Sequence, residues 1–362
     1  MEQKRTILLV DSSTELEIIK NKSKTGAQIL TLDYDTHRIL TTNNIEHEVS
    51  DNFLDEDMLE EIQNYAYTFA KWYDIPTVKE MLLYNGVNVG GLFYIELYVF
   101  LLEFLKRFYE IQQICLKYHD YKVLSSDTNH DYVRIFSKNG EVLNSKIQKQ
   151  QFHYDSITFE SKYYKIQLSY KNYLRLKKFL EKISRFFFNT KTNNDEIMLV
   201  EFNTIFYKEL FYKLKDHVLF FGLRRPPIWN LHSYSIIRKS NSKLIFMSQL
   251  STRELENKIS EGMRHVKINF NKLFTNESLA SFFVINGISI WELVKPSIEN
   301  LISRHGEEAI TNIEIIQKAL TKFKPRKILI LSESGQTEQI IIAKAKEVGI
   351  PVVRSEEHTS EL

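Results

Sequence analysis

Residues 7–11 read Ile-Leu-Leu-Val-Asp, and residues 197–201 read Ile-Met-Leu-Val-Glu. Each is a short apolar run that ends in an acidic residue, which is typical of a parallel strand buried on both faces. Similar apolar runs lie at 28–32, 122–125, 217–221, 243–247, 327–331 and 350–353, with helical patterns between them, among them 15–22, 56–72 and 91–118. This alternation predicts an α/β protein with tandem Rossmann-like parallel sheets and helical insertions.

A second pair of segments repeats along the chain. Residues 85–92 read Asn-Gly-Val-Asn-Val-Gly-Gly-Leu, and residues 286–293 read Asn-Gly-Ile-Ser-Ile-Trp-Glu-Leu. Each precedes helical residues and then a strand-like run. A duplicated α/β unit would give this order, and so would two independent units that need the same turn, helix and strand. The repeat therefore supports tandem modules and leaves duplication open.

Polar stretches set the expected domain boundaries. Residues 129–163 are polar and irregular, and we expect a hairpin there between 141–147 and 156–159, after a turn at Asn139-Gly140. We expect a first module at 1–163, a helical linker and boundary loop at 164–195, and a second module at 196–353. The helical pattern 164–188 has a basic face, which consists of Lys171, Arg175, Lys177, Lys178 and Lys182.

The last nine residues, 354–362, read Arg-Ser-Glu-Glu-His-Thr-Ser-Glu-Leu. They resemble the conceptual translation of a short-read sequencing adapter, and such segments are excluded from fold reasoning. We expect this tail to pack against nothing. We also expect the natural protein to continue beyond Val353, so that the second module is incomplete at its carboxyl end.

Composition excludes several classes of protein. Lys and Arg total 48 against 46 Asp and Glu, and this balance argues against binding of nucleic acid by bulk charge. The single cysteine, Cys115, excludes a disulfide framework within one chain and favours a reducing compartment. The apolar stretch Gly90–Phe108 contains four charged residues, which the centre of a membrane span tolerates badly. We expect a cytoplasmic protein and leave open its association with the inner face of the membrane.

Three segments carry a resemblance to a known family. Residues 224–230 (Arg-Arg-Pro-Pro-Ile-Trp-Asn), 286–293 and 327–352 together look like microbial surface-carbohydrate biosynthesis proteins of the GT-B type. This grouping includes capsule and surface-polysaccharide glycosyltransferases and CDP-glycerol glycerophosphotransferase-like proteins. The resemblance covers 196–353 clearly and 1–130 loosely. It implies a GT-B-like glycosyl or glycerophosphoryl transferase.

The resemblance also implies the substrates. The amino-terminal half would bind a glycan or a lipid-linked acceptor, and a carboxyl-terminal domain would bind a nucleotide-activated sugar or CDP-glycerol as donor. In the family the strand resembling 350–353 leads into a glutamine-histidine-glycine type turn, but here the adapter-like residues stand in that place. The donor site is therefore expected in a missing domain, and residues 1–353 alone are expected to be inactive.

Candidate site residues follow the predicted strands, because ligands of open parallel sheets bind at the carboxyl ends of strands. Residues 333–336 (Glu-Ser-Gly-Gln) precede a helix whose free N–H groups could meet a sugar hydroxyl or a phosphate, although Ser334 could simply cap that helix and Gly335 form the turn. The arginines at 224 and 225 could clamp a phosphate or carboxylate, or pair with surface acids. We assign acid/base or acceptor contact to Glu333, and substrate binding to Arg224, Arg225, Ser334, Gly335 and Gln336.

These loops should meet, because strand ends converge on one edge of a sheet. We expect the loops around Arg224 and Glu333 to line one concave surface that faces the missing domain. The segment 11–13 (Asp-Ser-Ser) lacks a glycine-rich phosphate pattern, and we expect it to cap a helix. The ten histidines show no metal-ligand spacing, so we expect no metal site. No dinucleotide fingerprint occurs, so we expect no cofactor, and the absence of a G-x-S-x-G elbow argues against a serine nucleophile.

Two other functions stay open. The first is a nucleotide-sugar 2-epimerase of the same fold, which would release free epimerised sugar without an acceptor. The second is a noncatalytic glycan-binding or assembly module, which would bind glycan and turn over no donor.

Overall fold

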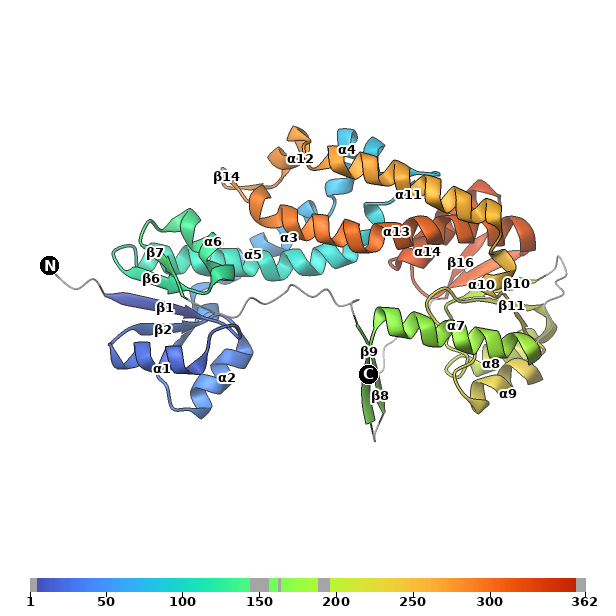
Figure 1. Ribbon diagram of the computed structural model, residues 1–362, viewed down its shortest axis with the longest axis horizontal. Helices are drawn as coiled ribbons and strands as arrows, with labels where there is room; N and C mark the ends of the chain where they lie inside the picture. Colours follow the sequence, from blue (N-terminus) through green and yellow to red (C-terminus); the bar gives the residue numbers. More distant parts are fainter. Residues whose placement is uncertain (1–4, 144–155, 162–163, 188–195, 356–362) are drawn as a thin grey trace. The chain divides into compact units, whose positions relative to one another are not determined.

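The computed structural model describes residues 5–143, 156–161, 164–187 and 196–355 (Figure 1). They form two parallel five-stranded sheets with many helices, which confirms the predicted Rossmann-like α/β class. The chain divides into two units. Unit 1 holds the described parts of Met1–Lys71, Glu96–Phe152 and Val284–Leu293, and unit 2 holds those of Trp72–Ile95, His153–Phe283 and Val294–Leu362.

The sheet of unit 1 has the strand order β3-β2-β1-β6-β7. Its central strand β1 pairs in parallel with β2 and β6, so that Leu9 lies opposite Leu30 and Ser125. Successive residues of a strand point to opposite faces, and Ile7 to Val10 are all fully buried. Both faces of β1 are therefore covered, as the apolar run predicts. The strands are β1 (Thr6–Val10), β2 (Gln28–Thr31), β3 (Glu48–Val49), β6 (Lys122–Ser125) and β7 (Gly140–Val142).

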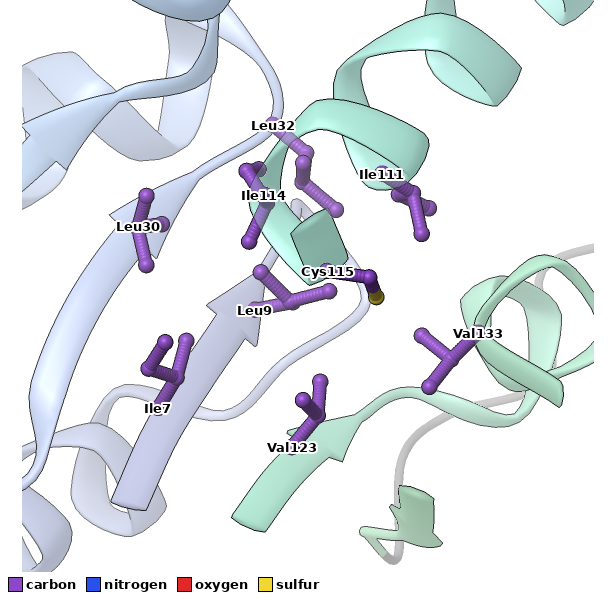
Figure 2. Close-up of a cluster of buried hydrophobic side chains, with 9 residues drawn as sticks. All are labelled: Ile7, Leu9, Leu30, Leu32, Ile111, Ile114, Cys115, Val123 and Val133. Atoms are coloured by element: carbon purple, nitrogen blue, oxygen red, sulfur yellow. The ribbon is translucent and has the colours of Figure 1, made fainter. Parts of the chain in front are cut away.

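Helices cover the two faces of this sheet. On one face, α1 (Leu16–Lys24) and α2 (Tyr34–Thr42) pack against Leu8 and Val10. On the other face, α5 (Tyr94–Lys117) and α6 (Asp127–Phe136) pack against Ile7 and Leu9. Figure 2 shows this second core, in which Cys115 lies among aliphatic side chains. Burial raises the pKa of the Cys115 thiol to about 12.

The sheet of unit 2 repeats the same topology, with the order β12-β11-β10-β15-β16. Its central strand β10 takes the place of β1, and the helices α8 (Lys208–Leu214) and α9 (Leu231–Lys239) cover Leu199 and Phe220. The runs 7–10 and 197–200 are thus the central strands of two sheets that share one strand order. The strands are β10 (Ile197–Val200), β11 (Val218–Phe221), β12 (Lys243–Leu244), β15 (Lys327–Ile330) and β16 (Val352–Arg354).

Each half of the chain inserts helices and a hairpin between its third and fourth strands. The hairpins β4 (Leu83–Tyr84) with β5 (Val87–Asn88), and β13 (Val284–Ile285) with β14 (Ile288–Ser289), both turn through Asn-Gly. Both turn residues have positive φ, with 46° and 76° in the first hairpin and 50° and 81° in the second, as a tight hairpin turn requires. The first hairpin belongs to unit 2, although it precedes β6 of the first sheet. The second hairpin belongs to unit 1, although it precedes β15 of the second sheet.

Long helices follow these hairpins. The helix α5 follows β5 and the 3₁₀ turn η3 (Gly91–Phe93), and α13 (Trp291–Phe323) follows β14. The remaining insertion elements are η1 (Ser50–Phe53), α3 (Glu56–Phe69), η2 (Trp72–Asp74) and α4 (Pro76–Leu82) in the first half, and α10 (Met247–Leu250), α11 (Arg253–Leu273) and α12 (Glu277–Phe282) in the second. The helix α14 (Gln336–Glu347) connects β15 to β16.

The structure corrects the expected hairpin and linker. The segment Gly140–Val142 pairs in parallel with β6 instead of forming a hairpin with 156–159. The strand β8 (Ser156–Ser161) pairs with β9 (Tyr164–Ser169), so the helix α7 begins only at Tyr170 and ends at Phe187. The sequence of β9, Tyr-Lys-Ile-Gln-Leu-Ser, alternates polar and apolar residues, which favours a strand. Residues 144–147 and the boundary loop 189–195 lie outside the described residues.

The expectation that 354–362 pack against nothing is wrong for its first two residues. Arg354 pairs with Ile330 in β16, and the Ser355 N–H donates to the carbonyl of Ile330 at 2.9 Å. Backbone pairing of this kind needs no particular side chain. Residues 356–362 lie outside the described part of the chain. Among the described residues, no helix is both long and apolar enough to cross a bilayer.

Candidate functional site

The carboxyl ends of β10, β11 and β15 bring Glu201 and the two predicted segments, 224–225 and 333–336, to one edge of the second sheet. The Arg224 Nη2 atom lies 3.0 Å from Oε1 and 3.1 Å from Oε2 of Glu338, in the first turn of α14. A Cβ atom placed on Gly335 would lie 3.2 Å from the same Nη2. The loop at 224 and the loop at 333–336 therefore lie on the same edge, as the strand order requires. We call Glu201, 222–225, 333–336 and Glu338 the second-sheet edge.

Glu201 fixes the backbone of the arginine loop. Its carboxylate is buried, with the residue 3% exposed, and it accepts three backbone N–H groups. Oε1 accepts from Leu223 at 2.6 Å and from Arg224 at 2.8 Å, and Oε2 accepts from Arg225 at 3.0 Å. Charge-assisted bonds of this kind are short and strong. Glu201 also has φ of 59°, a strained conformation for a residue with a side chain, and such strain is found where a structure holds a particular geometry.

The helix α7 holds the same loop from its carbonyl side. The buried ammonium of Lys177 donates to the carbonyls of Gly222, at 3.1 Å, and of Leu223. The hydroxyl of Tyr173 donates to the carbonyl of Arg224. Because Glu201 takes the N–H groups and α7 takes the carbonyls, the loop backbone is bound on both sides, while the Arg225 side chain stays exposed.

Two further contacts make this loop stiff. The ring of Tyr173 stacks on Trp229, with centroids 6.1 Å apart and planes 26° apart, and burial raises the pKa of Tyr173. A Cβ atom on Gly222 would overlap the carbonyl oxygen of Arg225, so only glycine fits there. The loop is preorganised before any ligand arrives.

Glu338 is a buried carboxylate that lies inside a helix, so the rule that ligands meet strand ends does not select it. Burial raises its pKa above the usual range, and the Arg224 guanidinium opposes that shift. Its side chain is 5% exposed, whereas that of Arg224 is 41% exposed. The Arg224 guanidinium therefore contacts the Glu338 carboxylate and is also partly exposed to solvent.

The start of α14 differs from the expected cap. Gly335 is the N-cap residue, and no side chain caps the helix, so the interpretation of Ser334 as the cap is wrong. Ser334 and Glu333 are exposed, and the carbonyl of Ser334 accepts from the Gln339 amide at 3.1 Å. The Gln336 side chain accepts from Asn312 of α13 at 3.3 Å. The edge thus combines two arginines, an exposed carboxylate and a helix start without a side-chain cap, an arrangement that can bind an anion or a polyhydroxyl group.

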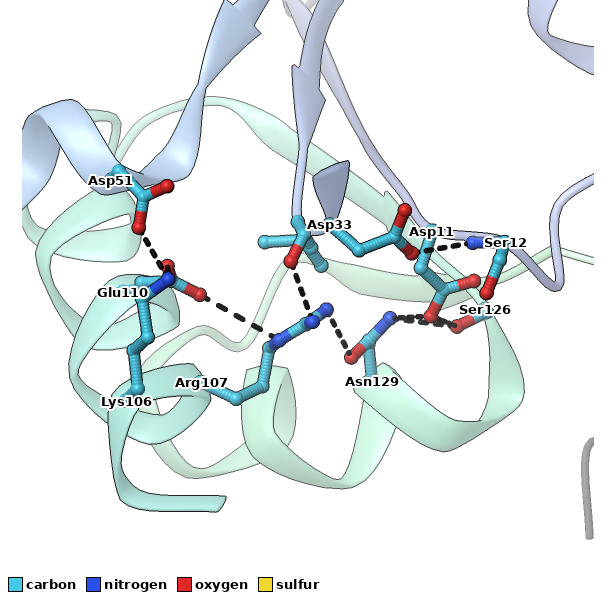
Figure 3. A network of polar contacts seen from close by, with 10 residues as sticks. Asp11, Ser12, Asp33, Asp51, Lys106, Arg107, Glu110, Ser126 and Asn129 are labelled. Atoms are coloured by element: carbon cyan, nitrogen blue, oxygen red, sulfur yellow. Dashed lines mark hydrogen bonds and ion pairs between the residues drawn. The ribbon is translucent and has the colours of Figure 1, made fainter. Parts of the chain in front are cut away.

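The equivalent edge of the first sheet carries a different network, which Figure 3 shows. Asp11 accepts from Ser126 at 3.2 Å and from Asn129 at 2.5 Å, both near the start of α6. The Arg107 guanidinium donates to the carbonyl of Leu32 at 2.6 Å and lies 3.6 Å from Glu110. Asp11, Ser126 and Asn129 therefore bond one another, whereas Oε1 of Glu110 is buried and has no hydrogen-bond partner among the described residues.

The expectation that 11–13 cap a helix is wrong. The N-cap residue of α1 is Glu15, and its side chain makes no capping hydrogen bond. Asp11 instead accepts the N–H of Ser13 at 3.0 Å, in addition to its bonds from Ser126 and Asn129. Asp33, after β2, does cap a helix, because it accepts the N–H of Thr36 at 2.7 Å.

A groove lies elsewhere in unit 2. It has a volume of about 610 Å³ between α11 and α13, and none of the predicted site residues lines it. Its lining is largely apolar and includes Val266, Phe270, Phe274, Ile302 and Ile310. In the described part of the chain, no group of three or more His, Cys, Asp or Glu side chains is placed to hold a metal ion.

The fold and the second-sheet edge define the class as an α/β protein with two Rossmann-like sheets of the same strand order. No protein-family model, curated protein or solved structure matches the chain.

Proposed function

We propose that the chain is a GT-B-like glycosyl or glycerophosphoryl transferase of surface-carbohydrate synthesis, and that the second-sheet edge binds the phosphate-bearing part of a substrate. The observation that carries the proposal is the arginine loop. A buried carboxylate and a buried ammonium fix its backbone at the carboxyl end of a Rossmann-like strand, beside the start of α14. The sequence resemblance supplies the class of donor, a nucleotide-activated sugar or CDP-glycerol, and of acceptor, a glycan or lipid-linked sugar.

The geometry suits this chemistry for a physical reason. Binding of a phosphate-bearing substrate needs hydrogen-bond donors that are already aimed at the phosphate, because reorienting them on binding costs free energy. Arg225 is exposed on a loop whose backbone cannot easily move, and Arg224 keeps part of its guanidinium toward solvent. Glu333, exposed on the neighbouring loop, takes the role of acid/base or acceptor contact.

Direct binding tests the phosphate contact without requiring turnover. Titration calorimetry would compare CDP, UDP and glycerol 3-phosphate with unphosphorylated glycerol. We expect Arg225→Ala to weaken binding of the phosphate compounds about 10- to 100-fold, the cost of one charge-assisted contact. The matched control is Arg253→Ala, another exposed arginine of unit 2, at the first position of α11. Equal binding by the two variants, or no binding of any phosphate compound by the wild type, would refute the assignment.

Turnover separates the candidate functions. In a form of the protein that turns over donor, Glu333→Gln should lower the rate of transfer and leave the thermal stability unchanged, because Glu333 is exposed. Formation of free epimerised sugar without an acceptor would favour the epimerase instead. Binding of glycan with no turnover by the intact protein would favour the noncatalytic module.

A further inference from the structure

The helix α7 presents an unusual outer face. Three apolar side chains spaced as on one face of a helix are exposed: Leu176 by 39%, Phe179 by 59% and Ile183 by 42%. The inner face of the same helix is mixed, since Lys177 and Ser184 are buried there together with Tyr173. A helix that only covered the protein core would keep its large apolar side chains away from solvent.

Cations flank the apolar stripe. Arg175, Lys178 and Lys182 are exposed and lie one position before Leu176, Phe179 and Ile183 respectively, so they form a parallel row beside it. The helix contains four lysines and two arginines against a single glutamate, Glu181, and that glutamate pairs inward with Lys177 at 3.4 Å. The outward charge of the helix is therefore strongly positive. An apolar stripe bordered by lysine and arginine is the pattern of a helix that lies in the plane of a membrane surface.

We propose that α7 is a membrane-surface helix that docks this chain on anionic lipid, with Leu176, Phe179 and Ile183 inserted between headgroups and the neighbouring cations bound to lipid phosphates. Charge complementarity decides the occupant: the row of Arg175, Lys178 and Lys182 attracts an anionic surface, and apolar side chains next to it gain by leaving water.

The position of α7 gives this docking a consequence. Its inner face holds the arginine loop, through the bonds of Lys177 and Tyr173 to the carbonyls of 222–224. Docking through the outer face therefore places the candidate site within one helix diameter of the lipid surface, about 10 Å. This last step rests on the proposed function, which then favours the lipid-linked acceptor over a free glycan. Binding of vesicles itself depends on no transferase chemistry.

Vesicle co-sedimentation of the full chain tests the docking. The probes are vesicles of phosphatidylcholine alone and vesicles with about 30 mol% phosphatidylglycerol, at about 0.1 M and about 0.5 M salt. We expect binding to the anionic vesicles that weakens at high salt. The pair Leu176→Ser and Phe179→Ser should reduce the membrane-bound partition roughly tenfold or more, and the pair Lys178→Glu and Lys182→Glu should abolish the preference for anionic lipid.

Matched controls exclude a general effect of hydrophobicity or charge. Phe206 and Leu231 are also exposed, by 73% and 87%, but they lie outside α7 and its row of cations, so their change to serine should leave binding unaltered. The charge control is Lys213→Glu with Lys239→Glu, two exposed lysines on α8 and α9.

A spectroscopic probe locates the contact. An environment-sensitive dye on Phe179→Cys, in a Cys115→Ser background, should shift to the blue on anionic vesicles, and the same dye on Lys239→Cys should not.

Three results would overturn the proposal. One is a wild-type chain that does not bind anionic vesicles. The second is binding that the α7 variants and the control variants retain equally. The third is a melting temperature that falls by several degrees in Leu176→Ser with Phe179→Ser, or a wild-type dimer that this pair converts to monomer, because the stripe would then be covered by protein.

Discussion

Replacing Glu201 with glutamine tests whether one buried carboxylate holds the candidate site together. The carboxylate accepts three backbone N–H groups, from Leu223, Arg224 and Arg225, at 2.6 to 3.0 Å. A glutamine has one acceptor oxygen, and its NH₂ group must face at least one of these donors. The change therefore removes the charge from three bonds and leaves at least one buried N–H without an acceptor. A bond to a charged group contributes about 1.5–3 kcal/mol and an unsatisfied buried donor costs about 1–3 kcal/mol, so we expect Glu201→Gln to lower the free energy of unfolding by about 3 kcal/mol.

Chemical denaturation and hydrogen exchange measure different parts of this effect. Urea denaturation followed by tryptophan fluorescence gives the global loss, and amide exchange reports the loop itself. We expect the amides of 223–225 to exchange faster in Glu201→Gln, while those of β1 in unit 1 keep their wild-type rates. The control is Glu333→Gln, an exposed carboxylate at the same edge, whose change should stay within about 0.5 kcal/mol of wild type. If Glu201→Gln also stays within that limit, or the loop amides keep their protection, the carboxylate does not position the loop.

The backbone of Glu201 allows a second test at the same position. Because φ is 59°, alanine at 201 keeps the steric strain and glycine relieves it, while both lose the carboxylate. We expect Glu201→Gly to be more stable than Glu201→Ala by about 1 kcal/mol. In the helix α8, Glu209 is exposed and the order should reverse, with glycine about 1 kcal/mol less stable than alanine. The same order at both positions would contradict the assignment of strain to Glu201.

Three further outcomes are expected. Burial raises the pKa of Glu338, so its stabilising contribution is present below the unfolded carboxyl pKa and is lost as pH rises through the folded value; relative to wild type, Glu338→Gln should therefore gain stability as pH rises above the ordinary carboxyl pKa in denaturation curves. Gly86→Ala and Gly287→Ala should lower the melting temperature by similar amounts, since both have positive φ and the Glu347 carboxylate beside Gly86 is the end of a flexible, part-exposed side chain that can move aside; a much larger loss for Gly86→Ala would contradict this. Cys115, with its pKa raised to about 12, should resist alkylation at about pH 8 until urea unfolds the chain.

The central strands could be predicted from sequence because their signal is local. An uninterrupted apolar run such as 7–10 or 197–200 fits only an element that is covered on both faces, and its length suits a strand. The membership of the hairpins could not be predicted in this way. The turn at Asn85 belongs with unit 2 because the Lys344 ammonium donates to its carbonyl and Glu314 accepts from its side chain at 3.1 Å, contacts that span more than two hundred residues.

In the candidate site too, sequence predicts the residues with a local signal and misses those that depend on long-range contacts. The rule that ligands meet the carboxyl ends of parallel strands was enough to select Arg224, Arg225 and Glu333. It could not select Glu338, which lies inside a helix and matters only because Arg224 reaches it. The helical spacing predicts that Lys177 lies on a basic polar face, but its acceptors are carbonyls 45 and 46 residues away. Helical periodicity shows which residues share a face and does not show which face is inside.

The two sheets place a carboxylate at the same position, and the difference in its use favours the second sheet as the site. Asp11 follows β1 and bonds side chains of the β6–α6 turn, whereas Glu201 follows β10 and bonds the backbone of the β11 loop. Ser126 and Asn129 donate to Asp11, so these polar side chains are not available to a ligand. Glu201 accepts only backbone N–H groups and occupies no other polar side chain. The Arg225 side chain therefore stays exposed on a fixed loop. A repeated strand order can therefore give one edge a closed polar network and the other an open one, and only the open edge has groups that are both held in place and accessible to a substrate.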